Sequence, residues 1–319
     1  MKHILITTIA AVLVVGCGES QQSAPSPESK PVEPVAETAQ TEPPTAKAPD
    51  VSINDAAKKG NPEDVKLHDA AEKGNLEAVK QHLAAGAYIN SRSSDKRERT
   101  PLHISAINGN LKIAELLVAE GADVDARDRG SDRPIHNAVT YKYKDFVEFL
   151  ISKGADVNAK NAAKHTPLHL VQEKDIAELL ILNGADLNAK DVLGYTPLHM
   201  VRKKEIAGLL IKSGADVNSK DSRSDTPLHT ADNAEVANLL IEMGANVNAK
   251  NEDGETPLVT YSMEITELLI SKGVDVNAVS DFEETALDFA LNEDLTELAD
   301  LLRKHGGKTG EELKAEGKY

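Results

Sequence analysis

Histidine is the residue type in this chain whose spacing most resembles that of a chemical site. Six of the ten histidines occupy one recurring motif position: His68, His103, His136, His169, His199 and His229. A row of imidazoles could bind a metal, and His165 with His169 has the i, i+4 spacing that zinc sites use. His165 precedes Thr166, however, and threonine often starts a helix, so the two rings need not share a helical face. We therefore expect no metal site.

One further segment resembles part of a phosphate-binding loop, Gly306-Gly307-Lys308-Thr309-Gly310. That loop also needs a glycine five residues before Gly307, where Leu302 stands, and a preceding strand, whereas residues 298–304 have a helical pattern. The chain contains no Gly-x-Ser-x-Gly and no His-Glu-x-x-His motif. We expect no catalytic residues, no enzyme activity and no cofactor.

The elements that position the histidines repeat along the chain. Thr100-Pro101-Leu102-His103 returns in altered form at residues 133–136 (Arg-Pro-Ile-His), unchanged at Thr166 to His169, Thr196 to His199 and Thr226 to His229, and more weakly at 256–259 and 285–288. Threonine offers its hydroxyl as an N-cap, and proline fits the first helical position, where its missing N–H costs nothing. Each copy therefore predicts the start of a helix.

A second helix follows in each unit. The segment 113–120 places Ile113, Leu116 and Leu117 on one face, and Gly121 can take the left-handed conformation that ends a helix. A pair of such helices cannot bury its apolar stripe alone, so the units must stack. The repeats predict an all-α repeat solenoid.

The Thr-Pro-Leu-His starts and the Gly-Ala-Asp-Val-Asn turns, for example at residues 154–158 and 214–218, are similar to the ankyrin-repeat consensus over about residues 65–307. This resemblance implies stacked ankyrin helix pairs with projecting hairpin-like fingers, which bind other proteins through the fingers and the concave helical face. It also implies that the motif histidine is structural, bonded to the neighbouring threonine and to backbone. We expect about eight units in residues 53–319, with a C-terminal cap at 285–319.

The repeat length changes along the chain. The starts are spaced 33, 33, 30, 30, 30 and 29 residues apart, so the four units that begin at 166, 196, 226 and 256 are short. Leu116 lies sixteen residues after Thr100, but Leu179 lies only thirteen after Thr166, which places the loss between the two helices. Three residues are a little less than one helical turn, so we expect a shortened first helix in these units.

Composition limits the partners. The 319 residues carry a formal charge of -16, from 36 basic and 52 acidic residues, and such a surface repels a phosphate backbone. The single cysteine, Cys17, cannot form an internal disulfide. We expect a protein partner, no nucleic acid and a monomeric chain.

The first residues of the chain have the pattern of a targeting segment. A basic start is followed by residues 4–15, a mostly apolar run that would reach about 18 Å as a helix, short of the roughly 30 Å of a bilayer core. The run predicts a signal peptide (residues 1–16). Its end, Leu13 to Cys17, resembles the lipobox of bacterial lipoproteins, which implies cleavage before Cys17 and lipidation of Cys17. The alternative is an ordinary signal peptide with a cysteine placed there by chance.

Residues 17–52 form the next segment. Seven of the fourteen prolines lie in residues 18–50, among Ser, Glu, Gln, Thr and Ala, a composition that predicts a disordered linker. Gly18 stands where an aspartate would retain an enterobacterial lipoprotein in the inner membrane, which favours the outer membrane, facing the periplasm. The expected location is the bacterial cell envelope, with a lipid anchor as the sole membrane contact.

The finger tips offer the candidate partner-binding residues. Formal charge runs from +2 (91–99), +1 (127–133) and +2 (159–165), through two neutral tips (189–195 and 219–225), to -2 (249–255) and -3 (279–284). This gradient suggests that an acidic region of a partner meets the first tips, at Arg97, Arg99, Arg129 and Arg133. Chance variation among solvated loops is the alternative.

Apolar side chains offer a second group of candidates. Val192, Leu193 and Tyr195 share the middle tip, where an exposed aromatic beside aliphatic residues is a plausible hot spot. Tyr141 and Tyr143 replace the usual Gly-Asn turn and are expected to be exposed, whereas Phe146 and Phe149 belong to the buried stripe.

Three classes of function fit these features. The favoured one is a lipid-anchored protein-protein interaction module of the bacterial cell envelope. The alternatives are an inhibitor or immunity-type regulator of a single partner enzyme, and an enzyme hidden in the stack, which would need a deep pocket with perturbed titratable groups.

Overall fold

The computed structural model of the chain describes residues 61–318, which belong to the unit spanning Ser52–Tyr319. The described residues form helices and turns without strands, so the predicted all-α repeat fold is confirmed. The predictions for the signal peptide, Cys17 and the linker (residues 17–52) fall outside the described residues.

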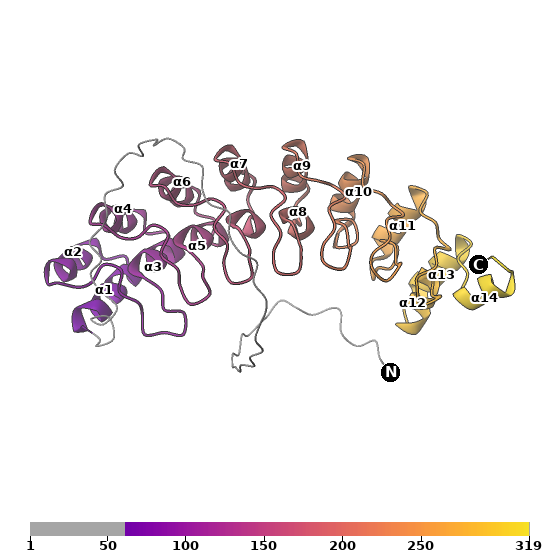
Figure 1. Ribbon diagram of the computed structural model, residues 1–319, viewed down its shortest axis with the longest axis horizontal. Helices are drawn as coiled ribbons and strands as arrows, with labels where there is room; N and C mark the ends of the chain where they lie inside the picture. The colour runs from indigo at the N-terminus through magenta and orange to yellow at the C-terminus, as the bar shows by residue number, and fades with distance from the viewer. Residues whose placement is uncertain (1–60, 319) are drawn as a thin grey trace, which may run out of the picture. The chain divides into compact units, whose positions relative to one another are not determined.

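The helices come in pairs that follow one another in a single row (Figure 1). The first helices of the pairs are α1 (Pro62–Glu72), α3 (Pro101–Asn108), α5 (Pro134–Thr140), η2 (Pro167–Leu170), α8 (Pro197–Met200) and α12 (Ala286–Asn292). The second helices are α2 (Leu76–Ala84), α4 (Leu111–Ala119), α6 (Lys144–Ser152), α7 (Lys174–Leu182), α9 (Lys204–Lys212), α10 (Ala234–Glu242), α11 (Met263–Ser271) and α13 (Thr296–Lys304). A last short helix, α14 (Gly310–Ala315), follows them.

Each second helix buries one apolar face against its neighbours. In α4 the buried residues are Ile113, Ala114 and Leu117. The sister positions in α6, α7, α9, α10, α11 and α13 repeat this spacing, whereas α2 buries only Val79. The apolar residues at these positions join one continuous cluster that runs through the whole row. Full burial of one such Leu or Ile contributes roughly 1.5–3 kcal/mol, so the packing between units stabilises helices of nine residues that would not persist alone.

The first helices differ in length. α3 has eight residues and α5 has seven, whereas η2 is one 3₁₀ turn and α8 has four residues. The units that begin at Thr226 and Thr256 have only turns at this place. After η2 and α8 the chain becomes extended at Val171 and Val201, so the missing residues are taken from the first helix.

At the four Thr-Pro-Leu-His starts the threonine and the histidine bond to each other. At α3 the backbone N–H of Thr100 donates to Nδ1 of His103 (3.2 Å), and the Thr100 hydroxyl lies 2.8 Å from the same nitrogen. Because Nδ1 accepts, Nε2 carries the proton and donates to the carbonyl oxygen of Asp132, 2.9 Å away. Thr100 and His103 thus form a capping box at the start of α3, where the Thr-Pro motif predicts the helix to begin. Burial lowers the pKa of His103 to about 4.

Loops project between consecutive units and are called fingers here. They are finger one (91–99), two (127–133), three (159–165), four (189–195), five (219–225), six (249–255) and seven (279–284). At their bases, asparagine side chains join one unit to the next. Asn158, for example, accepts from the N–H of Asp186 (2.7 Å) and donates to the carbonyl of Gly184 (2.9 Å), and Asn218 does the same to Asn246 and Gly244.

Candidate protein-binding surface

A backbone hydrogen bond joins the tip of each finger to the next. The N–H of Val192 on finger four donates to the carbonyl of Ala163 on finger three (3.0 Å), and Ser222 donates to Leu193 in the same way (2.9 Å). Equivalent bonds join the remaining pairs: Arg129 to Arg97, Ala162 to Gly130, Glu252 to Arg223 and Asp281 to Asp253. The tips are therefore held in register as one platform.

Finger four shows how the sequence exposes its tip. Oδ1 of the buried Asp191 accepts from the N–H groups of Leu193 (2.8 Å) and Tyr195 (2.9 Å), and Gly194 is left-handed with φ of 82°. This turn directs Val192 and Leu193 into solvent, where they are 52% and 54% exposed. The structure thus provides an exposed aliphatic pair at the predicted middle tip.

Tyr195 does not join that pair. Its ring stacks on the ring of His199, with centroids 5.5 Å apart and planes 19° apart, and burial raises its pKa. It is partly buried at the base of finger four, where its backbone carbonyl accepts from Nε2 of His169. The exposed apolar residues on this finger are therefore Val192 and Leu193.

The four arginine candidates fall into different environments. Arg133 takes the place of the motif threonine, and its side chain is 13% exposed and paired with Asp125 (3.3 Å) and Asp156 (3.1 Å). Arg99 is 28% exposed and lies 4.0 Å from Asp95.

The other two arginines are more accessible. Arg97 is 57% exposed and lies 4.0 Å from Asp132. Arg129 is exposed at the tip of finger two. Of the four, Arg129 and Arg97 present the most accessible charge.

Tyr141 and Tyr143 lie in the turn between α5 and α6, not on a finger. They are 48% and 37% exposed. The ring of Tyr143 packs against Gly109 of the preceding unit, because a Cβ added to that glycine would lie 2.7 Å from Tyr143 Cε1. Phe146 is fully buried and Phe149 partly so. This aromatic cluster is separate from the finger tips.

A further set of cations shares one register position on successive fingers. These residues, called the basic row here, are Arg92, Arg127, Lys160, Lys190, Lys220 and Lys250, and all are exposed. Their alignment is visible where Nζ of Lys190 donates to the carbonyl of Lys220 (2.7 Å) and Nζ of Lys250 donates to that of Val279 (2.9 Å). A net charge for each finger does not reveal the row. It appears when the fingers are aligned on the turn residue that follows each cation, which is Ser93 on finger one and aspartate or asparagine on fingers two to six.

The histidine row makes protein contacts. Nε2 of His136 donates to the carbonyl groups of Ala159 and His165, and Nε2 of His229 donates to that of Glu255. His165 and His169 stack with centroids 5.6 Å apart, but Nε2 of His165 faces Asp191 (3.2 Å) and Nδ1 of His169 faces Thr166. Within residues 61–318 no group of three metal-binding side chains converges.

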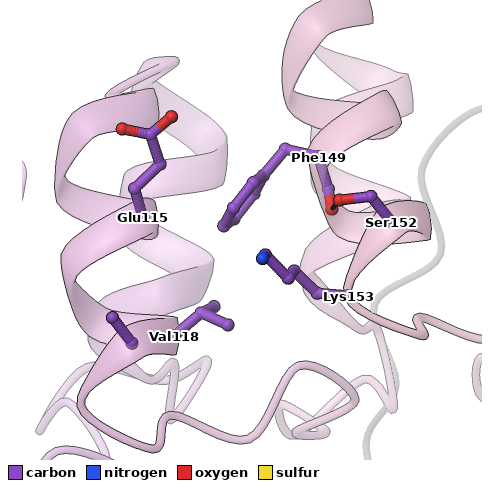
Figure 2. A pocket seen from close by; sticks show the side chains of 6 residues that line it. Glu115, Val118, Phe149, Ser152 and Lys153 are labelled. Atoms are coloured by element: carbon purple, nitrogen blue, oxygen red, sulfur yellow. Dashed lines mark hydrogen bonds between the residues drawn. The ribbon is translucent and has the colours of Figure 1, made fainter.

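A cavity of about 480 Å³ lies between α4 and α6 (Figure 2). Phe149 and Lys153 line it from α6 and its end, and Glu115 and Val118 line it from α4. Nζ of Lys153 lies 5.8 Å from the centre of the Phe149 ring, and the Ser152 hydroxyl donates to a backbone carbonyl. The lining contains no histidine, and its serine bonds to the backbone.

The comparisons with known proteins agree with the architecture. A family model described as ankyrin repeats (3 copies) matches residues 67–161 and 162–251. A putative ankyrin repeat protein, FPV232, of Fowlpox virus (strain NVSL) is 42% identical over 57 residues, which are 18% of this chain and 12% of that protein. A putative ankyrin repeat protein of Rickettsia bellii (strain RML369-C) is 42% identical over 45 residues, 14% of this chain and 19% of that protein. The chain thus spans less than a fifth of either relative.

No helix among residues 61–318 has the length and apolar character needed to cross a bilayer.

Proposed function

Because the chain belongs to the ankyrin-repeat family, whose model matches more than half of its residues, we propose that it captures a partner protein in the bacterial cell envelope while anchored there by lipid. Ankyrin repeats imply a protein-protein interaction module, and the family is generally a non-enzymatic scaffold. The envelope location and the anchor rest on the sequence motif that ends at Cys17.

The exposed tip of finger four carries the proposal for the binding surface. Val192 and Leu193 are more than half exposed although they are bulky and aliphatic. They stand on backbone that is bonded to fingers three and five, so little ordering entropy is lost when a partner covers them. An apolar pair on a rigid platform with a polar surround has the composition of an interface centre.

Site-specific photo-crosslinking in cells tests this surface. A photoreactive amino acid at Val192 or Leu193 should give a discrete crosslinked partner, which mass spectrometry identifies. Leu182 is the matched control, because it is 83% exposed but lies at the end of α7, away from the fingers. Equal crosslinking from Leu182 and from the finger positions would contradict the proposal.

Fractionation tests the anchor. Cys17→Ser removes the sulfur that lipid would modify, so the protein should move from the membrane fraction to the soluble periplasmic fraction. Two acyl signals hold a protein on a membrane far more firmly than one, so the shift should be nearly complete. A Cys17→Ser protein that stays in the membrane fraction would refute lipid anchoring at this residue.

A further inference from the structure

Finger three has an unusual charge. Residues 159–165 contain Lys160 and Lys164 and no carboxylate, in a chain whose net charge is -16. Both lysines are exposed, and neither takes part in the ion pairs of residues 61–318. On finger five, by contrast, Arg223 is paired with Asp253 of finger six at 2.6 Å. Finger three thus presents two positive side chains, Lys160 and Lys164, that a partner can reach.

Lys164 occupies a position that is costly for a lysine. Its φ is 59°, in the left-handed region, which every finger adopts at this position. The residue there is glycine on fingers four and six (Gly194 and Gly254) and non-glycine on the others (Glu98, Ser131, Ser224 and Glu283). A residue with a Cβ pays about 1–2 kcal/mol for this conformation, which glycine avoids. Five of the seven fingers bear this cost, so the position tolerates a side chain and holds that of Lys164 at the tip.

The lysines stand beside the exposed apolar pair. The hydrogen bond from Val192 N–H to the Ala163 carbonyl joins the two tips between Lys164 and Leu193. Lys190 of the basic row lies at the base of finger four, on the same side as Lys160. Fingers six and seven carry net charges of -2 and -3 and would repel an acidic ligand, so its acidic part is confined to the N-terminal side of finger four.

From this arrangement we propose that the tips of fingers three and four bind an acidic segment of a partner protein. Carboxylates of the segment meet Lys160 and Lys164, and a bulky apolar side chain next to them packs on Val192 and Leu193. The inference rests on the proposed function and specifies the chemistry of the partner. The charges determine which way the segment lies across the two fingers, and contact with the aliphatic pair contributes most of the binding energy.

Fluorescence anisotropy with the full chain tests the proposal. The probe is a short fluorescein-labelled peptide in which a run of glutamates precedes Leu-Phe, and the control peptide has lysines in place of the glutamates. Lys160→Glu with Lys164→Glu should weaken binding of the acidic probe at least about tenfold, and added salt should weaken binding to the unaltered chain. Lys250→Glu, in the same row but on finger six, should change binding by less than about twofold.

Two further variants separate binding from folding. Lys164→Gly should weaken binding of the acidic probe, because it removes a positive charge. It should also raise the midpoint of thermal unfolding, because glycine adopts the left-handed conformation without strain. Val192→Ser with Leu193→Ser should weaken binding of the acidic probe without changing the circular dichroism spectrum of the chain. The inference is overturned if the acidic probe fails to bind the full chain, if the lysine peptide binds equally well, or if the double lysine variant binds unchanged. A partner crosslinked at Val192 in any of these cases would leave the proposed function standing.

Discussion

Nε2 of His103 donates to the backbone carbonyl of Asp132, 2.9 Å away, and so joins the start of α3 to the finger of the following unit. His169, His199 and His229 make the same bond to Tyr195, Asp225 and Glu255. Each of these rings accepts at Nδ1 and donates at Nε2, a pattern that only neutral imidazole can satisfy. The contacts between units therefore depend on keeping buried histidines uncharged.

Stability should fall as the pH is lowered below about 6.5. Burial lowers the pKa of His103 from 6.5 to about 4 and also lowers the pKa of His136, His169, His199 and His229. The unfolded chain then takes up protons first, so the stabilisation is complete above the unfolded value and is lost as the pH falls through the folded one. For His103 alone the full loss is about 3 kcal/mol.

Urea unfolding at about pH 7 and about pH 5 measures this effect, since carboxylates with lowered pKa, such as Glu173, contribute only below about 4.5. His103→Gln is the matched variant, because an uncharged amide in that place should make the decline shallower. Equal stability at the two pH values would show that the histidines do not limit the fold.

Arg133→Ala should destabilise the chain, and Arg129→Ala should not. Arg133 is paired with Asp125 and Asp156 and is nearly covered, so its loss removes two ion pairs and the packing of its stem. The two carboxylates are partly exposed to water, so the cost should be about 1 kcal/mol. Arg129 is exposed at a finger tip, so its removal should change the free energy of unfolding by less than about 0.5 kcal/mol. Chemical unfolding of the two variants side by side decides this, and equal effects would contradict a structural role for Arg133.

Lys164→Gly should stabilise the chain by about 0.5–1 kcal/mol, because glycine adopts the left-handed conformation freely but also gains entropy in the unfolded state. Lys160→Gly on the same finger is the control. Lys160 is not among the residues with positive φ, so this change should destabilise by about 0.5–1 kcal/mol. Opposite signs in thermal unfolding are the expected outcome, and the same sign for both would rule out strain at Lys164.

Gly194→Ala should cost more than Gly184→Ala. Both glycines are left-handed, but a Cβ on Gly194 would lie 2.6 Å from the backbone nitrogen of Ser222, whereas a Cβ on Gly184 would meet nothing within 4 Å. We expect a loss of about 2–4 kcal/mol at Gly194, where fingers four and five must separate, and about 1–2 kcal/mol at Gly184. Hydrogen exchange of the Ser222 amide should accelerate only in the Gly194 variant, and slow exchange there would mean that the fingers stay joined.

The repeating parts of this chain could be predicted because each unit applies the same local chemistry. The Thr-Pro starts, the Ile-Ala-x-x-Leu stripe and the Gly-Ala-Asp turns together imply helices, stacking and fingers. The environment of a single side chain could not be predicted in this way. The sequence suggests that Arg133 is a charged surface residue. In the structure its side chain lies against Asp125 and Asp156 of neighbouring turns and is only 13% exposed.

Tyr195 is a similar case. Its place on a finger tip suggested exposure, but a ring at that position reaches the imidazole of the next helix start and stacks on His199. Lys190 could be recognised only by alignment across units, because a charge count within finger four cancels it against the buried Asp191. Contacts between units, and not propensity within them, determine which candidates face the solvent.

The asparagines at the finger bases reach only from one unit to the next, as Asn158 does to Asp186 and Asn218 to Asn246. A pulling force applied to the two ends of the repeats would therefore load these junctions in series, and each would fail independently of those farther along. Stretching the domain should yield a succession of small force peaks, one for each unit peeled away, and not a single large rupture.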